Sequence, residues 1–164
     1  MQRKKVAIIM GSSSDAGIML PAATILKHLG IDYDFLVVSA HRSPQWMFKY
    51  AEIIQEEKIA LVIAGAGGAA HLPGMMAALT NVPVIGVPIK SSNSIDGWDS
   101  LLSIVQMPND VPVATVAINN AHNAGILAAQ MLSISDEGIK EGLLALKIAN
   151  QKKVIQQNET LKKI

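Results

Sequence analysis

The sequence has 164 residues and a net charge of +1; half of its residues are hydrophobic and 16% are charged. This length suits one domain, and we expect a single domain over residues 1–164. The balanced charge and the 4% share of aromatic residues argue against a nucleic-acid-binding protein, and the absence of cysteine excludes disulfides and thiolate metal sites.

The low charged fraction indicates contacts between subunits. An average soluble protein is about one quarter charged. A domain of this size has a limited interior, so part of its apolar excess falls on the surface, where a neighbouring subunit would cover it. We therefore expect a homo-oligomer.

The uncharged stretch over residues 59–89 is long enough to cross a bilayer. It is interrupted by glycine and proline at Gly65, Gly67, Gly68, Pro73, Gly74, Pro83, Gly86 and Pro88. Buried parallel strands also read as apolar runs, and we interpret the stretch as such strands, with no membrane contact. Residues 1–10 are basic and then apolar, but no Ala-x-Ala cleavage pattern follows them, so we expect a cytoplasmic protein.

Apolar runs alternate with helical patterns from the N-terminus onward. After a strand over residues 6–10, we expect a helix that stops before Gly30, with Pro21 causing a kink or a late start. A second strand over residues 33–38 is followed by a helix that Pro44 opens. The later elements are expected in the same alternation: strands over residues 59–64, 82–89 and 111–118, and helices over residues 72–79, 98–106, 119–132 and about 136–161.

Five strands alternating with helices predict an α/β protein with a five-stranded parallel sheet between two layers of helices, plus a C-terminal helix. In the flavodoxin-like strand order 2-1-3-4-5, the switch point lies between strands 1 and 3. The loops after strands 1, 2 and 3 then lie side by side at the carboxyl ends of the strands. We expect the ligand-binding crevice there.

The loop after the second strand carries His41 and Arg42 side by side. Histidine is well suited to moving protons near neutral pH, and the planar guanidinium of arginine suits phosphate or carboxylate. A lone loop histidine is usually a surface residue, and Arg42 could equally form a structural salt bridge. Their adjacency at the predicted switch point favours a functional role.

The loop after the first strand reads Gly-Ser-Ser-Ser-Asp over residues 11–15. Backbone N–H groups and serine hydroxyls at such a place can hold a phosphate or ribose hydroxyls, and Asp15 would accept hydrogen bonds from sugar hydroxyls. The alternative is plain helix capping by Ser14 and Asp15. The spacing alone does not separate the two.

The loop after the third strand, residues 65–71, fits the loose dinucleotide pattern G-x-G-x-x-A. The acidic residue expected about twenty positions later is missing. We favour glycines that let the backbone approach a small reacting group, with a tight packing turn as the alternative. His71, beside this loop, is expected either to hold the residues that contact the ligand in position or to pack against its neighbours.

Other features of the sequence give no site. His28, near a helix end, is expected to be structural, and His122 serves capping or a subunit contact as plausibly as chemistry. The four histidines show no metal-binding spacing, and neither a Gly-x-Ser-x-Gly elbow nor a P-loop is present. We therefore expect no metal.

Four motifs stand in order along the chain: Gly-Ser-x-Ser-Asp (11–15), Ser-Ala-His-Arg-Ser-Pro (39–44), Gly-Ala-Gly-Gly-Ala-Ala-His-Leu-Pro-Gly-Met (65–75) and Asp-Ser-Leu-Leu-Ser-Ile-Val-Gln-Met-Pro (99–108). Together they closely resemble the class I N5-carboxyaminoimidazole ribonucleotide mutases of purine biosynthesis, the PurE family. The resemblance extends to about Ser133.

The resemblance implies a homo-octamer and an isomerisation, without metal or cofactor, that moves a carboxyl group from N5 to C4 of an aminoimidazole ribotide. It makes His41 the general acid and base, and Arg42 the phosphate ligand. The substrate-binding residues that it implies are Ser12, Ser14, Asp15, Ser39, Arg42, Ala66, Gly67, Gly68, His71 and Leu72. The C-terminal helix over about 136–161 is expected in subunit contacts.

The chain departs from the family pattern at Ala16, at Ser43 and over residues 119–123, where the loop is shorter and more polar than in many members. Two other functions stay open. A related class carboxylates the ribotide directly with carbon dioxide, although the His-Arg pair and the third motif favour the mutase. A non-catalytic flavin- or nucleotide-binding module is the second, although the loops lack the stacking aromatic residues expected around a flavin.

Overall fold

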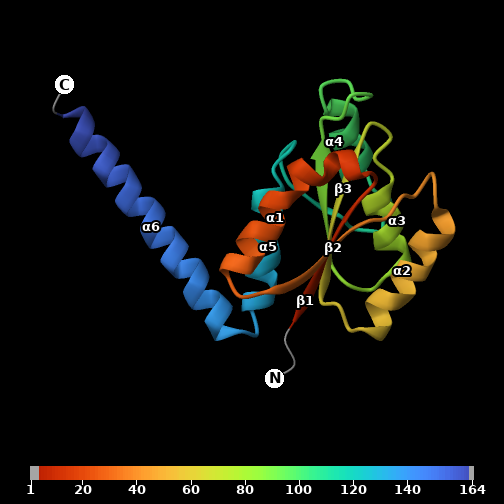
Figure 1. Cartoon of the computed structure of the whole chain (residues 1–164), viewed down its shortest axis with the longest axis horizontal. Coiled ribbons are helices and arrows are strands. Elements are labelled where there is room, and N and C mark those ends of the chain that lie inside the picture. The colour runs from red at the N-terminus through yellow and green to blue at the C-terminus, as the bar shows by residue number, and fades with distance from the viewer. Residues whose placement is uncertain (1–3, 163–164) are drawn as a thin grey trace.

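The computed structural model describes residues 4–162. A five-stranded parallel sheet with strand order β2-β1-β3-β4-β5 lies between helices on both faces, which confirms the predicted flavodoxin-like fold (Figure 1). The strands are β1 (Lys5–Met10), β2 (Asp32–Val37), β3 (Leu61–Gly67), β4 (Val84–Ile89) and β5 (Ala114–Thr115). The helices are η1 (Ser13–Asp15), α1 (Ala16–His28), α2 (Pro44–Glu56), α3 (Leu72–Leu79), α4 (Trp98–Val105), α5 (Ala121–Ser133) and α6 (Glu137–Leu161).

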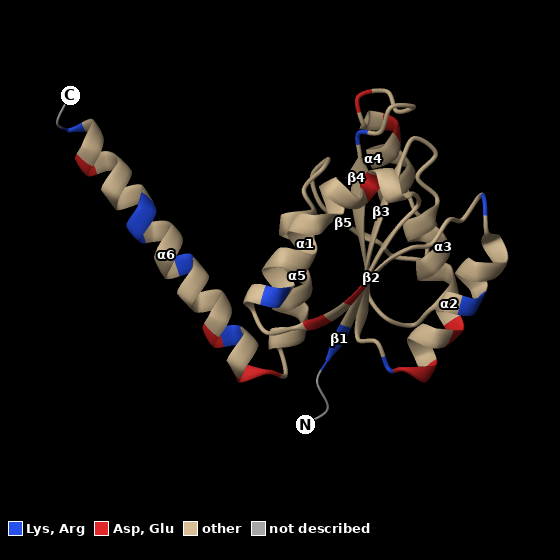
Figure 2. Cartoon of the chain, viewed as in Figure 1, with Lys and Arg blue, Asp and Glu red and all other residues tan. Residues whose placement is uncertain are grey.

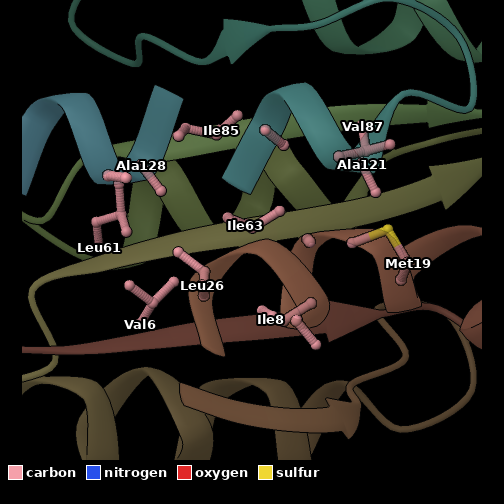
Figure 3. Close-up of a cluster of buried hydrophobic side chains, with 14 of the residues drawn as sticks. Val6, Ile8, Met19, Leu26, Leu61, Ile63, Ile85, Val87, Ala121 and Ala128 are labelled. Atoms are coloured by element: carbon pink, nitrogen blue, oxygen red, sulfur yellow. The ribbon is translucent and has the colours of Figure 1, made fainter. Parts of the chain in front are cut away.

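The central strands are apolar along their whole length because both of their faces are buried. Alternate residues of β1 enter two separate cores. Ile8 packs with α1 and α5 on one face of the sheet (Figure 3), while Ile9 packs with α2 and α3 on the other. Full burial of each such side chain contributes roughly 1.5–3 kcal/mol. These two cores hold the carboxyl ends of β1 and β3 in fixed register, Met10 beside Gly65.

Pro21 does not delay α1. The helix begins at Ala16 and contains Pro21 in its second turn, so the predicted late start is wrong. Pro21 lies on the exposed side of the helix. There, water can satisfy the carbonyl that lost its N–H partner. The predicted stop is confirmed, since Gly30 has φ +70°.

Strands β3 and β5 each end three residues away from the predicted position. β3 continues to Gly67, because its glycines pair with β4 up to Ile89. β5 is only two residues long, although Val116 and Asn119 still donate backbone hydrogen bonds to Gly86 and Pro88 of β4. Pro88 has no N–H to return, so the ladder becomes irregular at this edge.

Helix α6 leaves the body of the protein (Figure 1). Asp136 caps its first turn by accepting the N–H of Ile139 at 3.2 Å, and Ile139 is the buried residue of its 25. Basic and acidic residues are spread along the helix (Figure 2). Its exposed large apolar side chains are Leu144, Ile148, Val154, Ile155 and Leu161. Among residues 4–162, no helix is both long and apolar enough to cross a membrane.

Candidate functional site

A cavity of about 550 Å³ opens at the carboxyl ends of β1, β2, β3 and β4. Its size is typical of a small-molecule site. The loops after the first three strands meet there, as the strand order predicts. The predicted site residues that line it are Ser12, Ser14, Asp15, Ser39, His41, Arg42, Ala66, Gly67, His71 and Leu72.

The loop after β1 places a buried carboxylate in the wall of the cavity. Ser12, and not Ser14, caps the short helix η1, through a 3.4 Å hydrogen bond from the Ser14 N–H. Asp15 is 7% exposed, and although it stands at the N-cap position of α1, its carboxylate makes no capping hydrogen bond. The carboxylate is therefore free of the capping role that was the alternative.

Burial raises the pKa of Asp15 above its ordinary value. Hydrogen bonds from the Ser14 hydroxyl and the Ser12 backbone, and the positive charge of Arg42, act in the opposite direction without cancelling it. A carboxylate that lacks water accepts hydrogen bonds from a ligand readily, because these replace the lost solvation.

Arg42 ties the second loop to the first. Its Nη2 donates to the carbonyl oxygen of Gly11 at 2.5 Å, and its Nε donates to the Ser39 hydroxyl at 3.2 Å. These partners are neutral, so the guanidinium keeps its full charge for a ligand. Its place on the cavity wall suits an anionic group.

The side chains of His41 and His71 meet across the cavity wall. His41 Nε2 lies 2.7 Å from His71 Nδ1, and the rings are nearly perpendicular at 83°. In a neutral pair, one nitrogen donates the shared proton and the other accepts it. His71 stands at the N-cap position of α3 but makes no capping hydrogen bond, so its ring is committed to His41.

The glycines of the third loop allow close packing under the cavity. A Cβ on Gly67 would lie 2.9 Å from the carbonyl oxygen of Ile89 and 2.6 Å from the Cβ of Ser91. Gly68 has φ +65°, and its N–H donates to the buried hydroxyl of Ser100 at 2.8 Å. Gly68, a predicted binding residue, therefore supports the loop and is not among the residues that line the cavity.

The sequence analysis missed a fourth wall. Lys90, Ser91, Ser92 and Asn93, which follow β4, also line the cavity. The signal was present as a polar run directly after a predicted strand. It was left out because the expected crevice was centred on the switch point, whereas β4 lies one strand further along the sheet.

Comparison with known proteins agrees with this geometry. The model of the family described as "AIR carboxylase" matches residues 5–153. The chain belongs to the AIR carboxylase family. It is 54% identical to the N5-carboxyaminoimidazole ribonucleotide mutase of Thermotoga maritima, over 98% of this chain and 93% of that protein.

Two further relatives extend this result. The chain is 48% identical to the chloroplastic phosphoribosylaminoimidazole carboxylase of Vigna aconitifolia over 96% of its own length, but it spans only 28% of that longer protein. Its structure superposes on that of Treponema denticola PurE with a TM-score of 0.87 and 28% identity, covering 98% and 99% of the two chains.

The remaining histidines of this AIR carboxylase family member lie away from the cavity. His28 is in the last turn of α1 and His122 is exposed on α5, and neither lines the cavity. Across residues 4–162, no three His, Asp or Glu side chains gather where they could hold a metal ion. The ionisable side chains that the loops after β1, β2 and β3 bring to the cavity are those of Asp15, His41, Arg42 and His71.

Proposed function

We propose that this protein is an N5-carboxyaminoimidazole ribonucleotide mutase of de novo purine biosynthesis, an isomerase. One observation carries the proposal: a histidine able to move protons, His41, stands beside a guanidinium in a cavity of nucleotide size. Family membership and the mutase of T. maritima, matched over nearly its whole length, support the same activity.

In the proposed reaction His41 acts as both general acid and general base. It protonates N5 as the bond between N5 and the carboxyl carbon breaks, which releases carbon dioxide. C4 of the ring then attacks the carbon dioxide to form the new carbon–carbon bond, and His41 removes the proton from C4. A single histidine can serve both proton transfers: it gives a proton to N5 and takes one back from C4. The enzyme therefore returns to its starting protonation state.

The other residues are proposed to bind the ribotide. Arg42 pairs with the phosphate, and Asp15 accepts hydrogen bonds from the ribose hydroxyls with Ser12 beside it. The loop over residues 65–71 holds the carbon dioxide, because its glycines let the backbone come close to a small reacting group. The scheme needs neither metal nor cofactor.

Direct carboxylation of the ribotide is the second candidate. It is favoured by the similarity to the V. aconitifolia carboxylase, which is lower than that to the mutase and covers only 28% of a longer protein. The mutase remains the preferred function, because the T. maritima enzyme corresponds to this chain over 93% of its own length.

The proposal includes a homo-octamer in the cytoplasm, with α6 in subunit contacts. Leu144, Ile148 and Ile155 recur at spacings of four and seven and so share one face of α6, and each is at least 43% exposed. A helix with one buried residue has little tertiary packing to stabilise it. A neighbouring subunit would supply that packing.

A turnover assay in two forms tests the function. The purified protein receives either the N5-carboxylated ribotide, or the uncarboxylated ribotide with bicarbonate and no ATP. We expect fast formation of the C4-carboxylated product only from the first substrate. Efficient turnover of the second would assign the protein to the direct carboxylases, and a folded protein inactive with both would be a binding module.

The same assay tests His41. His41→Asn is expected to lose nearly all turnover while ribotide still binds. His28→Asn, a substitution outside the cavity, is the matched control and keeps full activity. Retained turnover in His41→Asn would remove His41 from the mechanism.

A further inference from the structure

The fourth wall of the cavity carries a cation that the proposed mechanism does not use. Lys90 follows β4 directly and lines the cavity with Ser91, Ser92 and Asn93. The other residue with a permanent positive charge in the lining is Arg42, and the lining carboxylate is Asp15. Lys90 therefore doubles the cationic charge available to a ligand.

The backbone at Lys90 is held in place. Its N–H donates to the side-chain oxygen of Asn119 at 2.8 Å, and the N–H of Asn119 donates to the carbonyl of Pro88 at 2.8 Å. Asn119 has φ +59°, a left-handed conformation that asparagine adopts more readily than most residues. The polar segment that departs from the family pattern thus fixes the starting point of the Lys90 side chain.

The ammonium group of Lys90 is held less firmly. It pairs with Asp96 at 2.6 Å, and the two side chains are 56% and 74% exposed. An exposed pair of this kind contributes about 0–1 kcal/mol. Lys90 lines the cavity, whereas Asp96 does not. The four rotatable bonds of the lysine side chain let its ammonium group leave Asp96 and turn toward the cavity.

The charge of the proposed substrate exceeds what one arginine balances. A phosphate monoester carries a charge of about −1.5 to −2 at neutral pH, and the carboxylate of the ribotide adds another. The guanidinium of Arg42 carries a single positive charge, and Asp15 adds negative charge to the same wall. A second cation facing the cavity would offset this imbalance.

We infer that Lys90 is a second anion-binding residue of the cavity, which leaves Asp96 when the ribotide binds and pairs with one of its anionic groups, the phosphate or the carboxylate. In the free enzyme, the ammonium group of Lys90 stays paired with Asp96. The inference rests on the proposed function, because the ribotide supplies the anion.

Titration calorimetry with two ribotides tests the role of Lys90 and separates the two anions. The uncarboxylated ribotide carries only the phosphate, and the C4-carboxylated ribotide carries both groups. Lys90→Met is expected to weaken binding of the C4-carboxylated ribotide about tenfold. Equal weakening with both ligands assigns Lys90 to the phosphate, and weakening with the carboxylated ligand alone assigns it to the carboxylate.

Asp96→Asn provides the opposite change. It removes the competing partner, so ribotide affinity is expected to rise about two- to threefold. This gain must vanish when Lys90→Met is also present, a coupling that a purely structural role would not produce. Lys49→Met, which removes an exposed lysine paired with Glu52 on α2, is the matched control and leaves affinity unchanged.

Two results would overturn the inference in different ways. If the unsubstituted protein binds both ribotides and Lys90→Met binds them equally well, Lys90 has no anion-binding role while the proposed function stands. If the unsubstituted protein binds neither ribotide, the proposed function fails and the role of Lys90 fails with it.

Discussion

The Nε2 atom of His41 and the Nδ1 atom of His71 share a 2.7 Å hydrogen bond between loops that lie thirty residues apart in the sequence. His71 therefore fixes the ring orientation of the proposed general acid and base. It also occupies one of the two ring nitrogens of His41, so in the neutral pair one histidine donates the shared proton and the other accepts it.

Replacement of His71 should affect turnover more than binding. His71→Ala is expected to lower kcat about 10- to 100-fold with KM changed less than threefold, because His41 loses its orienting partner. His71→Asn places an amide near the lost Nδ1 and should recover part of the rate. Steady-state kinetics measure kcat and KM for both variants, and an unchanged kcat in His71→Ala would contradict the positioning role.

A side chain at Gly67 should damage the site. In Gly67→Ala the new methyl group meets the carbonyl of Ile89 and the side chain of Ser91. The free energy of unfolding should therefore fall by about 1–3 kcal/mol. Turnover should fall with it, since two walls of the cavity separate. Gly17→Ala on α1 is the control: its Cβ meets nothing within 4 Å, and the helix should gain about 0.5 kcal/mol. Urea unfolding distinguishes the two, and equal stabilities would contradict the packing.

Asp15 should oppose folding stability at neutral pH. Burial raises the folded-state pKa of Asp15 above 3.8. Between pH 3.8 and that raised pKa, the folded protein holds a proton that the unfolded chain has lost. The free energy of unfolding therefore decreases as pH rises through this window, and the cost is complete above it.

Asp15→Asn removes this cost, so its Tm at pH 7 should exceed that of the unsubstituted protein, while ribotide binding weakens. The gain in Tm should shrink as the pH falls toward 3.8. Asp110→Asn is the control, because Asp110 is exposed and its φ of +69° suits asparagine equally well. Thermal melts across pH check the difference; equal Tm values at pH 7 would show that the carboxylate is not desolvated.

The apolar face of α6 should control assembly. The double variant Ile148→Glu and Ile155→Glu would place charge in the proposed subunit contact. Light scattering should then report a mass below that of the octamer. The control pair, Asn150→Glu and Gln157→Glu, adds the same charge at the same spacing on another face of the helix. A monomeric unsubstituted protein would refute the octamer.

The sequence predicted the alternation of strands and helices because apolar periodicity is a local signal. General topology rules for parallel sheets then led to the strand order and to the meeting of three loops. It did not predict that β3 runs through Gly67, since strand pairing with β4 is a tertiary interaction. The pairing of His41 with His71 likewise depends on side-chain directions that no spacing encodes. Lys90 was missed because its role arises from a wall that only the folded sheet brings to the cavity.

The position of β1 in the sheet has a consequence for synthesis on the ribosome. This strand precedes both of its neighbours in the chain: it is flanked by β2 on one edge and by β3 on the other, and β3 is complete only at Gly67. Until then, one edge of an almost entirely apolar six-residue strand is open to pairing with another nascent chain. Aggregation during translation should therefore depend on the time between the emergence of residue 37 and that of residue 67 from the ribosome, and slower translation over this interval should lower the yield of folded protein.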